Sequence, residues 1–451
     1  MSTINDNNLH FDTVIVGLGI TGLSSARYLA AKDGRIAITD SREIPPQLNT
    51  LKQEMSDIPL FLGCINKDLL CSAGRLVVSP GVSIHEPPVR DAIASGVPVI
   101  SDIELFCQHV TAPIVAITGS NGKSTVTTLL GLMAERAGMK IGLGGNLGTP
   151  ALDLISSTEP DLYILELSSF QLEMVHSLEA KAAVVLNISA DHLDRYSSIE
   201  DYAVAKQKVY KGNGTIVINM DDECVSGMSE PERRIKKFTL NEPDVDGFGT
   251  RIVNDCVWLV HGNESLMPES ELQIHGKHNT ANALAALALG TALDIPMSSM
   301  LEILREFPGL SHRCQWVRQV NSVNWYNDSK GTNVGACMAS ILGLGKDNNV
   351  VLIAGGEGKG ADFSELSKIA RDKLRAAVLM GVDAPQIERV LANIVPIYKA
   401  DDMAMAVRTA AGISEPGDIV LLSPACASFD MFKDYKARGN AFIAEVNNLT
   451  G

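Results

Sequence analysis

The sequence lacks several features that mark secreted, membrane-spanning or nucleic-acid-binding proteins. Lysine and arginine number 38 against 53 aspartate and glutamate, so the net charge is 38 − 53 = −15, which argues against broad contact with nucleic acid or an anionic membrane. No apolar run reaches the ~20 residues that a membrane-spanning helix needs. Residues 1–12 lack the apolar core of a signal peptide. We therefore expect a cytoplasmic protein without nucleic-acid partners or membrane insertion.

Cysteine and aromatic residues are also sparse. The eight cysteines are scattered without a CxxC pair, so we expect reduced and mostly buried thiols. Aromatic residues make up 5% of the chain and all hydrophobic residues 45%, so the cores consist mainly of alanine, leucine, valine and isoleucine. This apolar content can fill the cores of the about three domains that 451 residues suggest.

Strand-like and helix-like runs alternate along almost the whole chain. This alternation is typical of βαβ units and parallel sheets. Three blocks each contain a glycine-rich strand–turn–helix, and they begin near residues 13, 113 and 350. Residues 240–275 favour short strands and turns, as in a β insertion. The predicted fold class is α/β in three domains, with boundaries near residues 101 and 309.

The most informative motif is Thr-Gly-Ser-Asn-Gly-Lys-Ser-Thr at residues 118–125. It follows an apolar run and opens a helical pattern at 126–135. Such a turn cradles phosphate: loop N–H groups and the positive helix end face the anion, Lys123 supplies a mobile charge, and Ser124 can bind magnesium. The general P-loop pattern has a glycine where Ile117 stands, so this is a shortened version. The alternative is a glycine-rich connection with a chance lysine.

A second glycine motif, Gly17-x-Gly19-x-x-Gly22, follows the strand at 14–16 and opens a helix. The next strand ends in Asp40, at the distance where dinucleotide-binding folds place an acid for a ribose hydroxyl. A nicotinamide enzyme rarely needs a phosphate loop downstream, so we favour the pyrophosphate of another nucleotide. Residues 79–81 would form another lip of this cleft. A Rossmann-like domain without a ligand is the alternative.

Polar residues follow two further strands of the central block. Glu166 lies near the carboxyl end of the strand at 163–166, where open α/β sheets place ligands. The cluster 191–195 follows the strand at 184–188, and His192 there can bind metal or protonate phosphate. Lys206 lies in a helical segment at 199–210, flanked by alanines. Taken singly, these residues also fit a solvated acid, a packed histidine and a solvated lysine.

Three turns of the third block follow strands and should line one rim. They are residues 327–333, 355–362 and 423–428. Two lysines, two serines and backbone amides there form a plausible carboxylate or phosphate site. Ordinary αβ connections would explain the glycines but not the clustered lysines.

Taken together and in this order, the motifs resemble those of the Mur ligase family. The likeness spans all three blocks, whereas residues 40–75 and 225–275 carry little of it. Gly331 stands where alanine is more usual and Phe429 where leucine is, which are mild departures. The matching segments are 17–23, 118–125, 144–146, 165–173, 191–195, 278–282, 312–313, 327–330, 356–359 and 423–429.

The resemblance implies an ATP-dependent amide ligase of peptidoglycan precursor synthesis. It would join D-glutamate to UDP-N-acetylmuramoyl-L-alanine and release ADP and phosphate. Such an enzyme transfers the γ-phosphoryl group to a carboxylate, and the amine attacks the acyl phosphate. Lys123, Arg313 and magnesium would spread the charge on the transferring group. A carbamylated Lys206 is also implied, because a carbamate offers magnesium two oxygens and an ammonium offers none.

The resemblance further implies three domain roles and five sets of site residues. Residues 1–101 would form a Rossmann-like domain for the UDP substrate, 102–309 a central P-loop ATPase-like domain with a mostly parallel sheet, and 310–451 a Rossmann-like domain for the amino acid. The catalytic residues would be Lys123, His192, Lys206, Arg313 and Lys330. The ATP contacts would be Gly119, Ser120, Asn121, Gly122, Lys123, Ser124, Thr125, Asn279, Asn282, Arg313, Asp328 and Lys330. The UDP-substrate contacts would be Ile20, Thr21, Asp40, Ser41, Arg42, Ser79, Gly81, Asn146, Ser168 and Gln171. The D-glutamate contacts would be Thr332, Lys359, Ser428, Phe429 and Phe432. The magnesium ligands would be Ser124, Glu166, His192 and Lys206.

Three alternatives stay open from sequence. A sibling ligase would add another amino acid, such as glutamate to folate in the manner of a folylpolyglutamate synthase. An NAD-dependent oxidoreductase would use the first glycine loop and need no ATP. A nucleotide-dependent switch would bind without ligating. For all of them we expect a monomer acting on small molecules.

Overall fold

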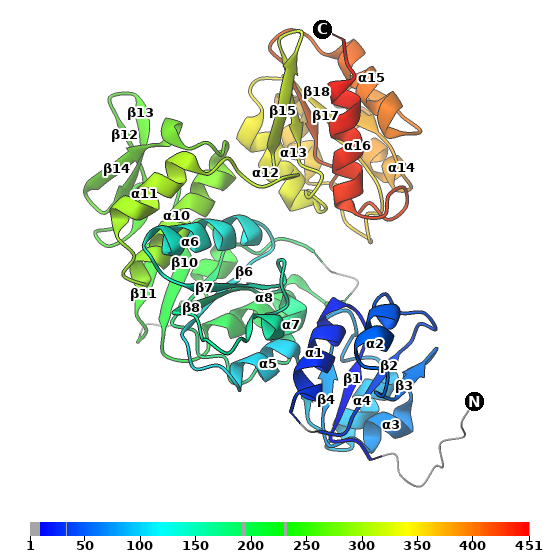
Figure 1. The fold of residues 1–451 in the computed structure, drawn as a ribbon. Coiled ribbons are helices and arrows are strands. Elements are labelled where there is room, and N and C mark those ends of the chain that lie inside the picture. Colours follow the sequence, from blue (N-terminus) through cyan, green and yellow to red (C-terminus); the bar gives the residue numbers. More distant parts are fainter. Residues whose placement is uncertain (1–9, 33, 192–194, 230–231, 451) are drawn as a thin grey trace.

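Three open sheets organise the chain, each formed by one continuous stretch of sequence (Figure 1). The structure is a computed structural model that describes residues 10–32, 34–191, 195–229 and 232–450. The N-terminal sheet has five strands in the order β3-β2-β1-β4-β5, the central sheet nine in the order β14-β13-β12-β11-β10-β9-β6-β8-β7, and the C-terminal sheet six in the order β15-β16-β20-β17-β18-β19. Helices cover the sheets, which confirms the predicted α/β class.

The N-terminal sheet is entirely parallel. Its centre, β1, lies between β2 and β4, so the strand order reverses beside β1 and opens a crevice at the carboxyl ends of these strands. The strands are β1 (Thr13–Val16), β2 (Ile36–Asp40), β3 (Leu60–Leu62), β4 (Leu76–Val78) and β5 (Val99–Ile100). The helices are α1 (Ile20–Ala30), α2 (Leu48–Glu54), α3 (Lys67–Cys71) and α4 (Pro87–Ala94).

The central sheet is parallel from β7 to β12 and continues as an antiparallel extension, β12 to β14, which confirms the predicted β insertion. The strands are β6 (Ile114–Thr118), β7 (Ile141–Gly145), β8 (Leu162–Glu166), β9 (Ala182–Val185), β10 (Thr215–Asn219), β11 (Ile235–Phe238), β12 (Phe248–Val253), β13 (Cys256–His261) and β14 (Glu264–Pro268). The α-helices are α5 (Asp102–Cys107), α6 (Lys123–Arg136), α7 (Ser169–Glu173), α8 (Ile199–Gln207), α9 (Glu223–Ser226), α10 (Lys277–Ala292) and α11 (Met297–Glu306). Short 3₁₀ turns are η2 (Ala151–Leu154), η3 (Lys208–Tyr210) and η4 (Glu269–Glu271).

In the C-terminal sheet, the strands β16, β20 and β17 are parallel neighbours, so the loops that follow them share one edge. The strands are β15 (Gln315–Val320), β16 (Val323–Asn327), β17 (Val350–Ala354), β18 (Leu374–Leu379), β19 (Ile397–Lys399) and β20 (Ile419–Leu422). The helices are α12 (Val334–Leu344), α13 (Leu366–Lys373), α14 (Ala384–Leu391), α15 (Met403–Ile413) and α16 (Tyr435–Asn447).

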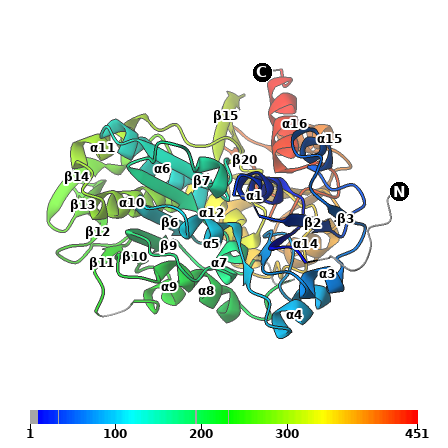
Figure 2. The same cartoon turned by 60° about the horizontal axis from the view of Figure 1, so that its bottom comes forward.

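The three units meet at different faces of the central one. Helix α12 of the C-terminal unit packs on α10, while α1 and β4 of the N-terminal unit pack on η2 and α5. Both views show the N-terminal sheet beside α5 and α7 (Figures 1 and 2). Helix α10 is buried almost throughout because α6, α11, α12 and the sheet surround it. The predicted boundaries near residues 101 and 309 stay predictions, although every strand falls on its expected side.

Two details differ from the sequence-based expectations. All eight cysteines are free as expected, but only Cys337 and Cys426 are buried. Cys64, Cys224 and Cys256 are exposed: Cys64 follows β3, Cys224 lies in the short helix α9 and Cys256 is the first residue of β13. The predicted helix at 199–210 ends as α8 at Gln207 and tightens into a 3₁₀ turn. Among the described residues, no helix is both long and apolar enough to cross a bilayer.

Candidate active site at the phosphate loop

The loop between β6 and α6 has a shape that two glycines permit. Gly119 and Gly122 have positive φ values of 147° and 84°. A Cβ on Gly122 would lie 2.3 Å from Oδ1 of Asn282, so α10 can approach only because a glycine stands here. The backbone N–H groups of Ser120 and Asn121 donate to the backbone and side chain of Asn187, at 2.9 and 2.8 Å. The loop is thus preformed at the N-terminus of a 14-residue helix, a site suited to phosphate.

Lys123 folds back over this loop. Its Nζ donates to the carbonyl oxygens of Gly119 and Ser120 at 2.8 and 2.9 Å. Burial lowers the pKa of Lys123, and the positive charge of Arg313 adds to this effect, whereas Glu166 opposes it. The amine therefore lies where its charge can neutralise an anion bound at the loop.

Side chains from two domains meet at Ser124. Its hydroxyl donates to Oε2 of Glu166 at 2.6 Å, and Nη2 of Arg313 donates to the Ser124 oxygen at 2.6 Å. Nδ2 of Asn146 donates to the other Glu166 oxygen at 2.7 Å. The structure thus brings three predicted site residues together around one carboxylate that is 2% exposed.

Lys206 is buried at 1% exposure, so the solvated alternative considered from sequence is wrong. Its Nζ donates to the Gly119 carbonyl oxygen at 2.9 Å and to Oγ1 of Thr118 at 3.3 Å, and it lies 4.5 Å from the centre of the Tyr202 ring. Burial, reinforced by the charge of Lys123, holds the pKa of Lys206 well below its usual range. Burial therefore favours the neutral, nucleophilic form of this amine beside the phosphate loop. His192 lies outside the described residues.

The oxygen atoms around Ser124 suit magnesium. The Ser124 hydroxyl and the Glu166 carboxylate supply hard oxygens at one point, which fits one such ion. Lys206 in its amine form supplies no oxygen, so its predicted ligand role requires the carbamate. Within the described residues, no group of three or more His, Cys, Asp or Glu side chains forms a metal cluster.

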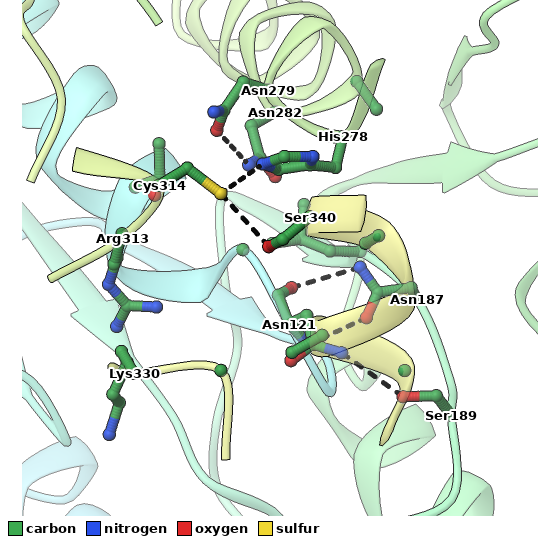
Figure 3. Close-up of a pocket in the computed structure, with 18 of the residues that line it drawn as sticks. Asn121, Asn187, Ser189, His278, Asn279, Asn282, Arg313, Cys314, Lys330 and Ser340 are labelled. Atoms are coloured by element: carbon green, nitrogen blue, oxygen red, sulfur yellow. Dashed lines mark hydrogen bonds between the residues drawn. The ribbon is translucent and has the colours of Figure 1, made fainter. Parts of the chain in front are cut away.

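Beside the loop lies a cavity of about 290 Å³ between the central and C-terminal domains (Figure 3). Helix α10 contributes one wall through Asn279 and Asn282, and the C-terminal domain contributes the other. Of the twelve predicted ATP residues, eight line the cavity: Asn121, Gly122, Thr125, Asn279, Asn282, Arg313, Asp328 and Lys330. The other four belong to the adjoining loop and first helical turn: Gly119, Ser120, Lys123 and Ser124.

Burial shapes the charges on the cavity's C-terminal wall. It raises the pKa of Asp328 to about 6, although hydroxyl groups of Ser340 and Ser423 donate to its carboxylate at 2.7 and 2.8 Å. Burial lowers the pKa of Lys330 to about 8, and the nearby charges of Arg313 and Lys123 add to this. The Asp328 carboxylate is thus held inside its own domain, while Lys330 lines the cavity with its Nζ 4.2 Å from the centre of the Tyr435 ring.

The N-terminal crevice has the predicted glycine turn, but the carboxylate of Asp40 accepts hydrogen bonds from the protein itself. One oxygen of Asp40 accepts from the Leu18 N–H at 2.7 Å, and Arg42 donates to both oxygens. Burial alone would raise the pKa of Asp40, but the hydrogen bonds from Arg42 and Leu18 lower it overall. Asp40 thus shapes the turn and holds Arg42 in place, which the sequence did not indicate.

The remaining predicted UDP-substrate residues lie in two groups. Around the crevice, Ser79 donates to the Gly17 carbonyl oxygen at 3.0 Å and packs against the glycine turn. Ile20, Ser41 and Gly81 are exposed there, and Thr21 is half-buried. In the central domain, Gln171 is buried in a capping box with Ser168 at the start of α7, and its Nε2 faces Asp102 at 3.4 Å. Only the Asn146 side chain of this second group meets Glu166 directly.

The structure brings the three C-terminal turns together, as expected. The Ala425 N–H donates to the Gly331 carbonyl oxygen at 2.9 Å, and Glu357 pairs with Ala427. Lys359 is exposed, with its Nζ 5.9 Å from the centre of the exposed Phe429 ring. The other three predicted D-glutamate residues differ in exposure: Ser428 is buried, whereas Thr332 and Phe432 are half-buried.

Two residues near the site were given no role from sequence. Nη1 of Arg195 donates to the Pro80 carbonyl oxygen at 2.9 Å and its guanidinium lies 4.0 Å from the Phe170 ring centre, so it joins the N-terminal and central domains. Asn333 caps α12 and contacts the central domain. An asparagine directly before an apolar helical run is a sequence signal for a cap, but nothing local indicates an interdomain contact.

This fold and site define a three-domain α/β enzyme with a phosphate-type loop beside a cavity between its central and C-terminal domains. Three profiles of one family match the chain in order: the MurD-like N-terminal domain at 11–101, the Mur ligase middle domain at 117–290 and the glutamate ligase domain at 312–426. The chain belongs to the Mur ligase family, whose members depend on ATP.

Known relatives agree along the whole chain. A UDP-N-acetylmuramoylalanine–D-glutamate ligase of Nitrosococcus oceani is 53% identical over 437 residues, which cover 97% of this chain and 96% of that protein. A ligase of the same name from Methylococcus capsulatus is 49% identical and covers 97% and 94%. A pseudomurein peptide ligase of Methanothermus fervidus shares the fold, with a TM-score of 0.62 at 16% identity, covering 97% of this chain and all of that one.

Proposed function

We propose that this protein joins D-glutamate to UDP-N-acetylmuramoyl-L-alanine at the expense of ATP, in cytoplasmic peptidoglycan precursor synthesis. The observation that carries the proposal is the meeting of Ser124, Glu166 and Arg313, from two domains, at a preformed phosphate loop. Full-length relatives at about half identity, named for this activity, support the choice of substrates.

In the first chemical step, a carboxylate oxygen of the muramoyl substrate attacks the γ-phosphorus, and the bridging oxygen leaves with ADP. Lys123 and Arg313 can spread the negative charge on the transferring group because both lie at the loop. Lys330 reaches the same cavity from the C-terminal domain. The basic cluster thus holds an anionic nucleotide despite the chain's net charge of −15.

In the second step, the amine nitrogen of D-glutamate attacks the acyl carbon and phosphate leaves. Lys359 is placed on the rim to pair with a side-chain carboxylate, beside Thr332, Ser428, Phe429 and Phe432. Because the three substrates are assigned to three domains, the domains must close before the amine can reach the acyl group.

Magnesium would be held by Ser124 and Glu166, and a second ion by His192 and carbamylated Lys206. When bound, the magnesium ions would neutralise negative charge on the phosphate groups. A low pKa supports carbamylation because only the neutral amine reacts with carbon dioxide. Intact mass measured under bicarbonate should exceed the sequence mass by one carbamate, and the increment should be absent in Lys206→Ala. An unmodified wild-type mass under these conditions would contradict this role.

The test of the proposed function is ADP release with each amino acid in turn. Release should require both UDP-N-acetylmuramoyl-L-alanine and D-glutamate, and Lys123→Ala should abolish it. Release with a folate and L-glutamate would favour the sibling ligase, and a change at the nicotinamide absorbance band would favour an oxidoreductase. We propose that the enzyme acts as a monomer, and light scattering at assay concentration should give about 48.2 kDa.

A further inference from the structure

The side-chain amide of Asn333 forms hydrogen bonds both within its own domain and to the central domain. Its Oδ1 accepts a 2.8 Å hydrogen bond from the N–H of Ala336, which caps α12. Its Nδ2 donates to Oδ2 of Asp191 at 3.0 Å and to Oδ1 of Asn121 at 3.4 Å. The residue is 7% exposed. An amide is required in this arrangement because one end must accept and the other must donate.

Both partners belong to loops at the phosphate site. Asn121 lies in the phosphate loop, where Asn187 and Ser189 hold it from the loop after β9 (Figure 3). Asp191 follows in that same loop. Asn333 therefore contacts both loops at once and joins them to the C-terminal domain.

The neighbours of Asn333 in sequence explain why its position matters. Lys330 lines the nucleotide cavity, and Thr332 is a predicted D-glutamate contact on the same turn between β16 and α12. The first turn of α12 also lies close to the central domain at Gly335, where a Cβ would come within 2.9 Å of Oγ of Ser189. A shift of this turn would move the nucleotide and amino-acid contacts together.

We propose that Asn333 is a positioning residue for the ligation: it sets the orientation of the amino-acid-binding domain over the phosphate loop. The Arg313–Ser124 hydrogen bond is a second point of attachment, and the packing of α12 on α10 is a third. Three separate points fix the orientation of a rigid body. The Asn333–Asp191 hydrogen bond joins an amide to a carboxylate group across the domain boundary. This inference rests on the proposed function only for its kinetic readout.

The substitution Asn333→Asp separates the two roles. Aspartate caps a helix about as well as asparagine, so α12 should be retained. Its carboxylate cannot donate, however, and it would face the carboxylate of Asp191. Asn66→Asp is the matched control, because the Asn66 side chain caps α3 through the Leu69 N–H at 3.0 Å in the N-terminal domain.

The kinetic test is a double-mutant cycle with Asp191→Asn. We expect Asn333→Asp to lower kcat at least about tenfold, the loss of roughly one charge-assisted hydrogen bond, while Asn66→Asp stays within about twofold of wild type. Asp191→Asn lowers activity on its own account. In that background, Asn333→Asp should cost less than about threefold, because the amide introduced at position 191 can donate to the carboxylate introduced at position 333. An equal penalty in both backgrounds, or none in either, would overturn the proposal.

A second readout needs no catalysis. Because the contact exists without substrates, small-angle scattering of the ligand-free full chain should differ between wild type and Asn333→Asp, and the double variant should return to the wild-type curve. Superimposable curves for wild type and Asn333→Asp, at an unchanged Tm, would overturn the inference. If the wild type released no phosphate, the proposed function would fail while this scattering test still decided the inference.

Discussion

The guanidinium of Arg313 donates to the hydroxyl of Ser124 across the boundary between two domains, at 2.6 Å. The same hydroxyl donates to Glu166, so a residue at the start of the C-terminal domain touches the carboxylate of the central sheet through one intermediate atom. The C-terminal domain therefore supplies charge directly to the phosphate loop. Catalysis should therefore depend on the C-terminal domain through Arg313, independently of the turns that are predicted to bind the amino acid.

Arg313→Ala should lower kcat by about 10²–10³-fold, because it removes a charge at the phosphate loop, where the proposed phosphoryl transfer takes place. The Kd for ATP should change much less, since Lys123 and the loop remain. Single-turnover kinetics and calorimetric ATP titration check the two quantities separately. Arg305→Ala, which removes an exposed guanidinium paired with Glu271, is the control and should leave both unchanged. A loss confined to ATP affinity would contradict a role in the transition state.

Gly122→Ala should weaken ATP binding at least about tenfold. The substitution forces an L side chain into φ +84° and places its Cβ 2.3 Å from Oδ1 of Asn282, so the buried Asn282 side chain must shift away from the loop. Gly96→Ala is the matched control: it has the same φ of +84° but nothing within 4 Å of the added Cβ. Left-handed backbone alone costs about 1–2 kcal/mol, so both variants should lose that stability, measured by urea unfolding. Equal ATP affinity in the two variants would contradict the steric argument.

Lys359→Ala should raise the KM for D-glutamate far more than the KM for ATP. The Lys359 side chain is exposed on the rim beside Phe429 and is not among the residues that line the nucleotide cavity. Steady-state kinetics with each substrate varied in turn gives both constants. Lys368→Ala, on the exposed side of α13, should change neither. Equal increases in both KM values would remove Lys359 from the D-glutamate site.

The fold and the phosphate loop could be predicted from the sequence because the patterns that indicate them are local. A strand, a glycine turn and Lys-Ser at a helix start lie within about a dozen residues, and the alternation of strand-like and helix-like runs predicts the parallel sheets. The interdomain contacts could not be predicted from the sequence. Arg313 and Ser124 are 189 residues apart, and no periodicity relates them. Family resemblance supplied Arg313, but it did not indicate Asn333.

The burial of single polar groups was the other feature that sequence left open. Lys206 lies in a helix in which Val204 is exposed, whereas Ala203 and Ala205 are buried. Tertiary packing alone decides that the lysine faces inward. Asp40 occupies the position of a ribose-binding acid, yet Leu18 and Arg42 occupy its oxygens. A sequence pattern predicts which residue types lie at the end of a strand or helix, whereas their hydrogen-bond partners depend on the folded backbone and on packing.

The last prediction concerns Asp102, where the chain passes from the first sheet to the central domain. Its carboxylate is 2% exposed, one oxygen has no hydrogen-bond partner among the described residues, and the other faces Nε2 of Gln171. Burial raises the pKa of Asp102 from 3.8 to about 6, although the Gln171 hydrogen bond opposes the shift. The folded state thus holds the proton more tightly than the unfolded chain does.

The sign of the pH effect follows from this difference. The stabilising contribution of protonated Asp102 is fully present below pH 3.8 and is lost as the pH rises through about 6, so at pH 7 the buried charge costs up to about 2–3 kcal/mol. Asp102→Asn removes that charge. The free energy of unfolding of the variant relative to wild type should therefore increase by roughly this amount between pH 4 and pH 7, as measured by urea titration at each pH.

Asp91→Asn provides a control of opposite sign. The hydrogen bond and charge of Lys67 hold the pKa of the half-buried Asp91 below its usual range, so its contribution is present above the unfolded pKa and is lost as the pH falls. Asp91→Asn should thus lose stability relative to wild type toward neutral pH, by a small amount, while Asp102→Asn gains it. A flat difference between Asp102→Asn and wild type from pH 4 to pH 7 would mean that Asp102 titrates normally, with water reaching its unpaired oxygen.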